Sequence, residues 1–160
     1  MSRSSMRSGI ILIEALVAAS ILSLVLASAI GAFLLTIRTS LGNGADVQAA
    51  FLAEEGLEAM RILRDNSWSG NIASQTSGDF YLAFDGTTWQ ATSINTYIDN
   101  AFERSITIFD VQRDGNGDIV TQGGAIDVDT KKVMVNVSWR TQSGTSTYSL
   151  STYLTNMFDN

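Results

Sequence analysis

Residues 9–18 read GIILIEALVA and open an apolar stretch that continues to Ile37. Within that stretch the only charged side chain is Glu14. A helix rises about 1.5 Å per residue, so a helix over residues 10–37 is longer than a hydrocarbon core about 30 Å thick. The stretch therefore predicts a membrane-spanning helix. A charged Glu14 would cost about 2.5–3.5 kcal/mol at the centre of a bilayer, so the carboxylate needs compensation.

The residues before this stretch predict its orientation. Residues 1–9 carry Arg3 and Arg7 and no acidic side chain. Basic residues beside a membrane-spanning helix favour the cytoplasmic side. We therefore expect a single-pass protein whose N-terminus is cytoplasmic and whose remaining chain lies outside the membrane.

The composition narrows the classes of function. The chain has 160 residues, a formal net charge of -6, no cysteine and no histidine. The acidic balance argues against a nucleic-acid partner, because phosphate binding needs an excess of Lys and Arg. Without Cys and His there is no disulfide, thiolate metal site, Cys nucleophile or His base. A serine nucleophile would depend on Lys131 or Lys132, which we expect to charge the end of a strand, so we predict no enzyme activity.

A short basic leader ends at Gly9, and Glu14 is the fifth residue of the apolar helix counted from Ile10. This arrangement resembles the class III signal of type IV prepilins and pseudopilins. The resemblance implies that a prepilin peptidase cuts after Gly9 and methylates the new amino group of Ile10. It also implies that Glu14 pairs with the ammonium group of a neighbouring subunit, a pair that a low dielectric strengthens.

Some positions differ from the usual pattern of that family. Ile10 and Ile11 stand where Phe and Thr are common, and the chain has no helix-kinking proline. Gly31 lies near the depth of that proline, and glycine costs about 1 kcal/mol in a helix relative to Ala. The sequence leaves open whether the helix is straight, kinked or locally melted at Gly31.

Two other interpretations of the apolar stretch stay open. Residues 27–29 read ASA, which is similar to the cleavage site of a secretory signal peptide. The stretch also fits a plain signal anchor followed by an unrelated outer domain. The length of the stretch and the acid inside it argue against a secretory signal, and Glu14 has no role in a plain anchor.

Helical periodicity resumes after residues 42–44, which read GNG. Small and apolar residues recur at helical spacing at Ala49, Leu52, Ala53, Gly56, Met60 and Leu63, with Leu57 at the border. We therefore predict an amphipathic continuation of the helix over residues 38–65, with a sheet packed on its apolar stripe. The part around residues 52–65 also resembles the corresponding helix of minor pilins and minor pseudopilins.

Residues 66–160 predict a globular β-rich domain. Residues 66–78 are rich in Ser, Asn and Gly and predict a connector anchored by Trp68. Alternating patterns predict strands at residues 80–84, 87–91, 102–112, 118–121, 131–140 and 145–156. One face of the fifth strand is expected to carry Val133, Val135, Val137 and Trp139, with Met134 on the other face.

The short connections between these strands predict how they pair. Turn signals at Asp85-Gly86 and Ser143-Gly144 favour an antiparallel sheet, for which we expect about three to five strands. The predicted fold class is α+β and pilin-like: a long N-terminal helix, membrane-spanning in its first half and amphipathic in its second, packed on an antiparallel sheet. The predicted division is a leader at 1–9, a transmembrane or filament-core helix at 10–37, the amphipathic continuation at 38–65 and the globular domain at 66–160.

Residues 114–118 read DGNGD and suggest a cation site. Asp114, Asn116 and Asp118 place oxygen atoms at alternate positions, as in the first half of a calcium loop. Ile119 stands where such a loop needs Gly, and Ala125 stands where it needs Glu. A hairpin turn explains the same residues and is the favoured interpretation. Apart from this calcium alternative, no cofactor or metal is predicted.

The leading prediction is a structural subunit, of the minor kind, of a type IV pilus or related filament. By the resemblance, it would move from the inner (cytoplasmic) membrane into an extracytoplasmic filament or to the cell surface. Its expected partners are other pilin or pseudopilin subunits, the prepilin peptidase, the inner-membrane assembly platform and, before assembly, the lipid bilayer. The alternatives are a minor pseudopilin of a type II secretion system and, in a different class, a membrane-anchored extracytoplasmic binding domain.

Overall fold

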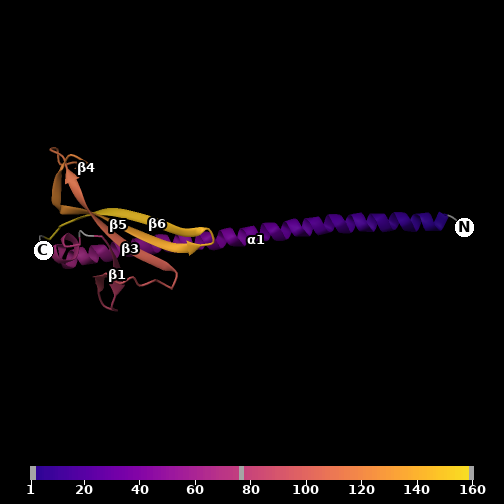
Figure 1. The fold of residues 1–160 in the computed structure, drawn as a ribbon, viewed down its shortest axis with the longest axis horizontal. Helices are drawn as coiled ribbons and strands as arrows, with labels where there is room; N and C mark the ends of the chain where they lie inside the picture. The colour runs from indigo at the N-terminus through magenta and orange to yellow at the C-terminus, as the bar shows by residue number, and fades with distance from the viewer. Residues whose placement is uncertain (1–2, 76–77, 159–160) are drawn as a thin grey trace. The chain divides into compact units, whose positions relative to one another are not determined.

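Figure 1 shows the computed structural model of the chain, an α+β fold in which an N-terminal apolar helix precedes an antiparallel sheet. The backbone is described for residues 3–75 and 78–158. Side chains are described over the same range from residue 11 onward, except at residues 39 and 41–43. The chain divides into two compact units, Met1–Asn43 and Gly44–Asn160, which we call the N-terminal unit and the C-terminal unit.

Helix α1 runs from Arg3 to Asn66 and contributes to both units. In the N-terminal unit the helix is unbroken at Gly31, where an added Cβ would meet nothing within 4 Å. No proline removes a backbone donor from the helix, because the chain has none. The helix is therefore not melted at Gly31.

In the C-terminal unit, one face of α1 is buried against the sheet. The buried helix residues are Ala49, Ala53, Gly56, Leu57, Ala59, Met60 and Leu63. The predicted stripe is confirmed at most positions, but it is wider than expected. Leu57, expected at the border, lies in the core, Ala59 was not predicted, and Leu52 is only partly buried. The sheet covers a broader arc of the helix than the sequence stripe indicated.

The C-terminal unit contains one antiparallel sheet of six strands. The strands are β1 (Asp79–Phe84), β2 (Trp89–Thr92), β3 (Phe102–Arg113), β4 (Ile119–Val120), β5 (Ala125–Thr141) and β6 (Gly144–Thr155). Their order is β2-β1-β3-β5-β6, and β4 pairs with the end of β3. The expected number of strands was too low, because the two-residue β4 also joins the sheet. The predicted antiparallel pairing is confirmed.

The centre of the core lies between β3, β5 and α1 (Figure 1). The register places Ile106 opposite Val135 and Ile108 opposite Val133, and all four side chains are buried. The predicted inner face of β5 is confirmed, since Val133, Val135, Val137 and Trp139 are all buried. Burial of each such aliphatic side chain stabilises a fold by about 1.5–3 kcal/mol.

Gly56 allows the backbone of α1 to approach the sheet closely. A Cβ at this position would lie 3.0 Å from Cγ1 of Val135 and 3.1 Å from Cδ of Arg104. Both distances are shorter than an ordinary van der Waals contact, so a side chain at residue 56 would force the helix away from β5.

Arg104 is a buried charge on the inner face of β3. Its Nη1 donates hydrogen bonds to the carbonyl oxygen of Leu52 at 3.1 Å and to Oε2 of Glu55 at 2.6 Å. Its guanidinium carbon lies 5.2 Å from the ring centroid of Trp89 on β2, within range of a cation–π interaction. Arg104 therefore links the helix to two strands of the sheet.

The β3–β5 ladder is interrupted at a bulge. Asp110 pairs with Lys131, but the next residue, Val111, pairs with Asp127, which leaves residues 128–130 of β5 without a β3 partner. Bulges bend strands, and residues 111–127 form an arm that carries β4 (Figure 1). Lys131 is buried inside β5 and pairs with Asp110, so the expectation that it charges a strand end was wrong.

The connector after α1 is more ordered than the sequence indicated. It contains a π-helix, η1, at Ser69–Ala73. Trp68 is buried, as predicted for an anchor, and Ile72 is buried beside it in the same core. Nδ2 of Asn71 donates a hydrogen bond to the carbonyl oxygen of Leu63 at 2.9 Å, which holds the connector on the last turn of α1.

The two predicted hairpin turns are confirmed. Between β1 and β2, Oδ1 of Asp85 accepts hydrogen bonds from the backbone of Thr88 and Thr87, each at 2.8 Å, and these bonds hold the pKa of Asp85 below its ordinary value. Gly86 adopts a φ of 97° and Gly144, after β5, a φ of 138°. Glycine adopts such backbone angles without the strain that a Cβ would cause.

Candidate functional site

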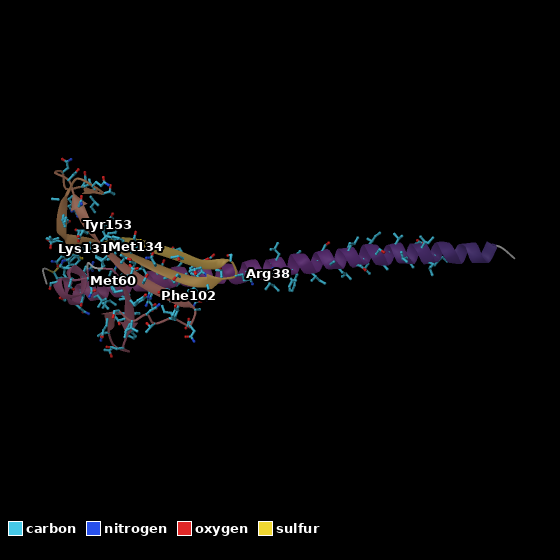
Figure 2. All side chains as sticks on the ribbon, viewed as in Figure 1. Arg38, Met60, Phe102, Lys131, Met134 and Tyr153 are labelled. Atoms are coloured by element: carbon cyan, nitrogen blue, oxygen red, sulfur yellow. The ribbon has the colours of Figure 1, made fainter. Side chains whose placement is uncertain are left out.

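Among the described residues, one helical segment is long and apolar enough to cross a membrane. It is Ile11–Arg38, with 28 residues and a mean hydropathy of 2.3. None of the segment is buried, and its side chains project around the helix (Figure 2). Leu12 and Leu24 are each 70% exposed. A surface that is apolar all round is stable only against lipid or other apolar helices.

The hydroxyl groups of this segment are satisfied within the helix. Four side chains donate a hydrogen bond of 2.8–3.0 Å to the carbonyl oxygen four residues earlier, namely Ser20, Ser23, Ser28 and Thr36. A hydroxyl bonded in this way does not need water as an acceptor. These residues therefore suit apolar surroundings.

Glu14 is the exception in this segment. Its side chain is exposed on the helix surface, and no other charged residue occurs between Ile11 and Ile37. Among the side chains that the structure describes, none donates a hydrogen bond to it. Ile11 and Val17, three residues away on either side, are its helical neighbours. A carboxylate in this setting needs a cationic partner once water is removed.

The predicted processing residues lie one turn from Glu14. The backbone of Gly9 and Ile10 continues α1, while the side chain of Ile10 lies outside the described residues. Positions four apart share one face of a helix. The main-chain nitrogen of Ile10 and the carboxylate of Glu14 therefore belong to the same helical face.

In the C-terminal unit, the predicted calcium residues form the turn between β3 and β4. Oδ1 of Asp114 accepts hydrogen bonds from the backbone nitrogen of Asn116 at 2.9 Å and of Asp118 at 3.0 Å. The nitrogen of Gly117 also donates to the carbonyl oxygen of Asp114 at 3.1 Å. One carboxylate oxygen of Asp114 thus stabilises the turn, which is the hairpin geometry favoured from the sequence.

A pocket of about 330 Å³ opens on the outer face of the sheet, the face away from α1. Its apolar wall includes Phe109, Ile119, Met134 and Tyr153, from β3, β4, β5 and β6. Met134 and Tyr153, both labelled in Figure 2, line this pocket from neighbouring strands. Lys132, which pairs with both Phe109 and Tyr153 across the sheet, also lines the pocket. Apolar walls with a few polar groups are typical of small-molecule sites, and this volume is at the lower end of their range.

The sequence alone did not predict this pocket. Met134 was expected among polar residues on the outer face, which was the one signal in the sequence. The pocket also depends on the arm, because Ile119 reaches it only when β4 pairs back on β3. A bulge of this kind has no signature that the alternating pattern of β3 and β5 reveals.

The described residues contain no group of three or more carboxylates placed to hold a metal ion. Among the described residues, the sites with chemistry of their own include a carboxylate in an apolar helix and an apolar pocket with an amino group. Comparison of the chain with known protein families, with curated proteins and with solved structures finds no match.

Proposed function

We propose that the chain is a structural subunit, of the minor kind, of a type IV pilus or related filament. The observation that carries the proposal is Glu14, a lone carboxylate on an apolar helical surface. Each described hydroxyl group on this surface donates a hydrogen bond to a carbonyl oxygen of the same helix. Cleavage after Gly9 creates an ammonium group on Ile10. That group neutralises Glu14 of a neighbouring chain in a low dielectric.

Assembly through this pair explains why the helix combines full apolar exposure with one acid. Apolar packing between helices has no preferred axial position, since one apolar turn resembles the next. A charge pair between two chains fixes that position, because a displacement of one turn separates the charges by about 5 Å. The subunit would then act mechanically, with no catalytic residues.

The mass and first residue of the mature protein test the processing step. The proposal requires a chain that begins at N-methylated Ile10. A chain that begins after Ala29 would show a secreted protein, and an intact Met1 or Ser2 would show a plain signal anchor. Either result overturns the proposal.

Substitution of Glu14 tests the assembly step. Glu14→Gln keeps the size of the side chain and removes its charge, so membrane insertion is retained while entry into filaments falls about tenfold or more. Ser20→Ala is the matched control in the same helix, because its hydroxyl bonds only to the carbonyl oxygen of Leu16. Membrane fractions and sheared filaments are compared by immunoblot. Equal entry of Glu14→Gln and Ser20→Ala into filaments would contradict the role of the charge.

A second candidate function is a membrane-anchored extracytoplasmic binding domain. The pocket lined by Met134, Tyr153 and Lys132 favours it, because these residues fit a ligand with an apolar ring and an anionic group. Naphthalene-2-sulfonate is a suitable probe for the whole chain in detergent micelles. The methyl resonance of Met134 should shift, while that of Met60, buried in the core, should not. No shift at millimolar probe would exclude this candidate.

A further inference from the structure

The strand β6 (Gly144–Thr155) is a free edge of the sheet. Its residues from Gly144 to Thr155 all pair with β5, and no other described strand pairs with it. The opposite edge, β2, is only four residues long. The unpaired N–H and C=O groups along a long edge strand form a template for another strand.

Proteins usually protect such an edge, and β6 lacks the usual protection. Residues 144–155 contain no charged residue and no proline, and the β5–β6 ladder has no register shift. The pairing with β5 continues one residue past β6, because the nitrogen of Asn156 donates to the carbonyl oxygen of Asp129 at 2.8 Å. Charges, prolines and bulges are the features that block pairing at edges. The edge of β6 is therefore open to a second strand.

The sequence of this edge is nearly the same in both directions. Residues 145–155 read TSTYSLSTYLT, with Leu150 at the centre. An antiparallel pairing of two such strands about Leu150 sets Ser149 opposite Ser151, Tyr148 opposite Thr152 and Thr147 opposite Tyr153. Pairs of an aromatic with a β-branched residue, and hydroxyl pairs, are favourable across strands. No like charges face each other in this register.

The inner face of the edge is also unobstructed at its centre. A groove of about 470 Å³ lies beside α1, lined by Leu150 of β6 and by helix residues that include Phe51, Leu57 and Glu58. The helix therefore leaves the inner side of Leu150 partly open. A second sheet has room to continue the first one past β6.

We propose that β6 is a self-association site, at which the β6 strands of two copies of this chain pair antiparallel about Leu150. The two sheets become one, and the contact is isologous, with each copy presenting the same strand to the other. The contact uses neither Glu14 nor the apolar helix, so it is independent of the proposed filament role and adds a second mode of association.

Cysteine crosslinking of the full chain in detergent micelles tests the register, since the chain has no cysteine of its own. Ser149→Cys and Ser151→Cys, on differently tagged copies, face each other across the proposed contact. Oxidation of the mixture should give a heterodimer at least about fivefold more abundant than the homodimer of either variant alone. Cysteines in one variant are diagonal neighbours about 7–8 Å apart, which is beyond normal disulfide reach. No excess of heterodimer overturns the proposal, and a homodimer of Ser149→Cys alone would show parallel pairing instead.

Ser105→Cys, on the central strand β3, is the control for random collision and should not crosslink.

The double variant Ser149→Lys, Ser151→Lys places lysines opposite lysines in two places on exposed positions. It should weaken the dimer about tenfold or more with unchanged circular dichroism, and an undiminished dimer would contradict the pairing. Glu14→Ala should leave the crosslink intact, which separates this proposal from the filament proposal.

Discussion

The two parts of helix α1 differ in where their apolar side chains lie. In the N-terminal unit the segment Ile11–Arg38 could cross a membrane by its length and composition, and none of it is buried. In the C-terminal unit the apolar residues of α1 gather on one face, and that face lies in the core. A helix that is apolar all round and one with a single apolar stripe belong to different surroundings. The distribution of apolar side chains therefore indicates different surroundings for the two parts of the helix.

Their carboxylates show the same difference. Glu55, in the C-terminal unit, has its cation within the chain, since it accepts a 2.6 Å hydrogen bond from Arg104. Glu14 has no such partner among the described side chains. A charge paired inside the chain contributes to the stability of the fold, whereas a charge in an apolar segment without such a pair needs compensation from elsewhere. The comparison thus separates a residue that holds the fold from one to which the proposed function gives a role in assembly.

The same substitution in both units should give opposite defects, and this is the largest effect that we expect. Val135→Asp buries a charge beneath Gly56 and should destabilise the C-terminal unit by more than about 4 kcal/mol. Val25→Asp, on the exposed apolar surface of α1, should leave that unit folded and oppose membrane insertion by about 2.5–3.5 kcal/mol.

Limited proteolysis reports the folding of the C-terminal unit, and carbonate extraction of membranes reports insertion. Val135→Asp should be digested but remain in the membrane. Val25→Asp should resist digestion but be extracted. If both variants are digested, or if both are extracted from the membrane, the two units do not behave independently.

A second pair compares two glycines of α1, Gly56 in the C-terminal unit and Gly31 in the N-terminal unit. Gly56→Leu has no room, because even a Cβ would lie 3.0 Å from Val135, and it should destabilise the C-terminal unit by about 3 kcal/mol. Gly31→Leu meets nothing within 4 Å and replaces a poor helix former with a good one, so it should be tolerated. Thermal melting by circular dichroism measures both variants in detergent micelles. A stable Gly56→Leu protein would show that α1 does not pack closely on β5.

Most of the fold was predictable because its signals are local and periodic. The alternation of Val133, Val135 and Val137 fixes which face of β5 is buried, and the turn residues Asp85 and Gly86 fix a hairpin. Glu14 was found from the sequence because a lone acid in an apolar stretch is visible without any structure.

The features that were missed depend on contacts between distant segments. The bulge at Asp110 and Val111 changes which residues of β5 face β3, and no local pattern records it. Lys131 looked like a surface charge, yet it is buried in β5 and pairs with Asp110 at the last register position before the bulge. The wide buried arc of α1 likewise reflects the breadth of the sheet, which the helix sequence does not encode.

The smallest effect concerns the arm and its dependence on pH. The hydrogen bond from Nε of Arg113, 2.6 Å long, and a second from Thr130 hold the pKa of Asp127 below its ordinary value of 3.8. A carboxyl with a lowered pKa in the native state stabilises the fold fully above the ordinary pKa. That stability is lost as the pH falls through the lowered value. Asp127→Asn should therefore lower the melting temperature by about 2–4 °C at pH 6, because an ion pair of this exposure contributes about 0.5–1 kcal/mol.

The difference in melting temperature between Asp127→Asn and the unchanged protein should shrink as the pH falls from 5 toward 3. Protonation of Asp127 removes the same charge that the substitution removes. Asp118→Asn is the matched control in the same arm, because the side chain of Asp118 takes part in no ion pair among the described residues. Its melting temperature should follow that of the unchanged protein at every pH. A gap for Asp127→Asn that stays constant from pH 6 to pH 3 would show that the ion pair with Arg113 does not hold the arm. Asp127 would then be a carboxylate of the C-terminal unit that does not hold the fold, unlike Glu55 in its pair with Arg104.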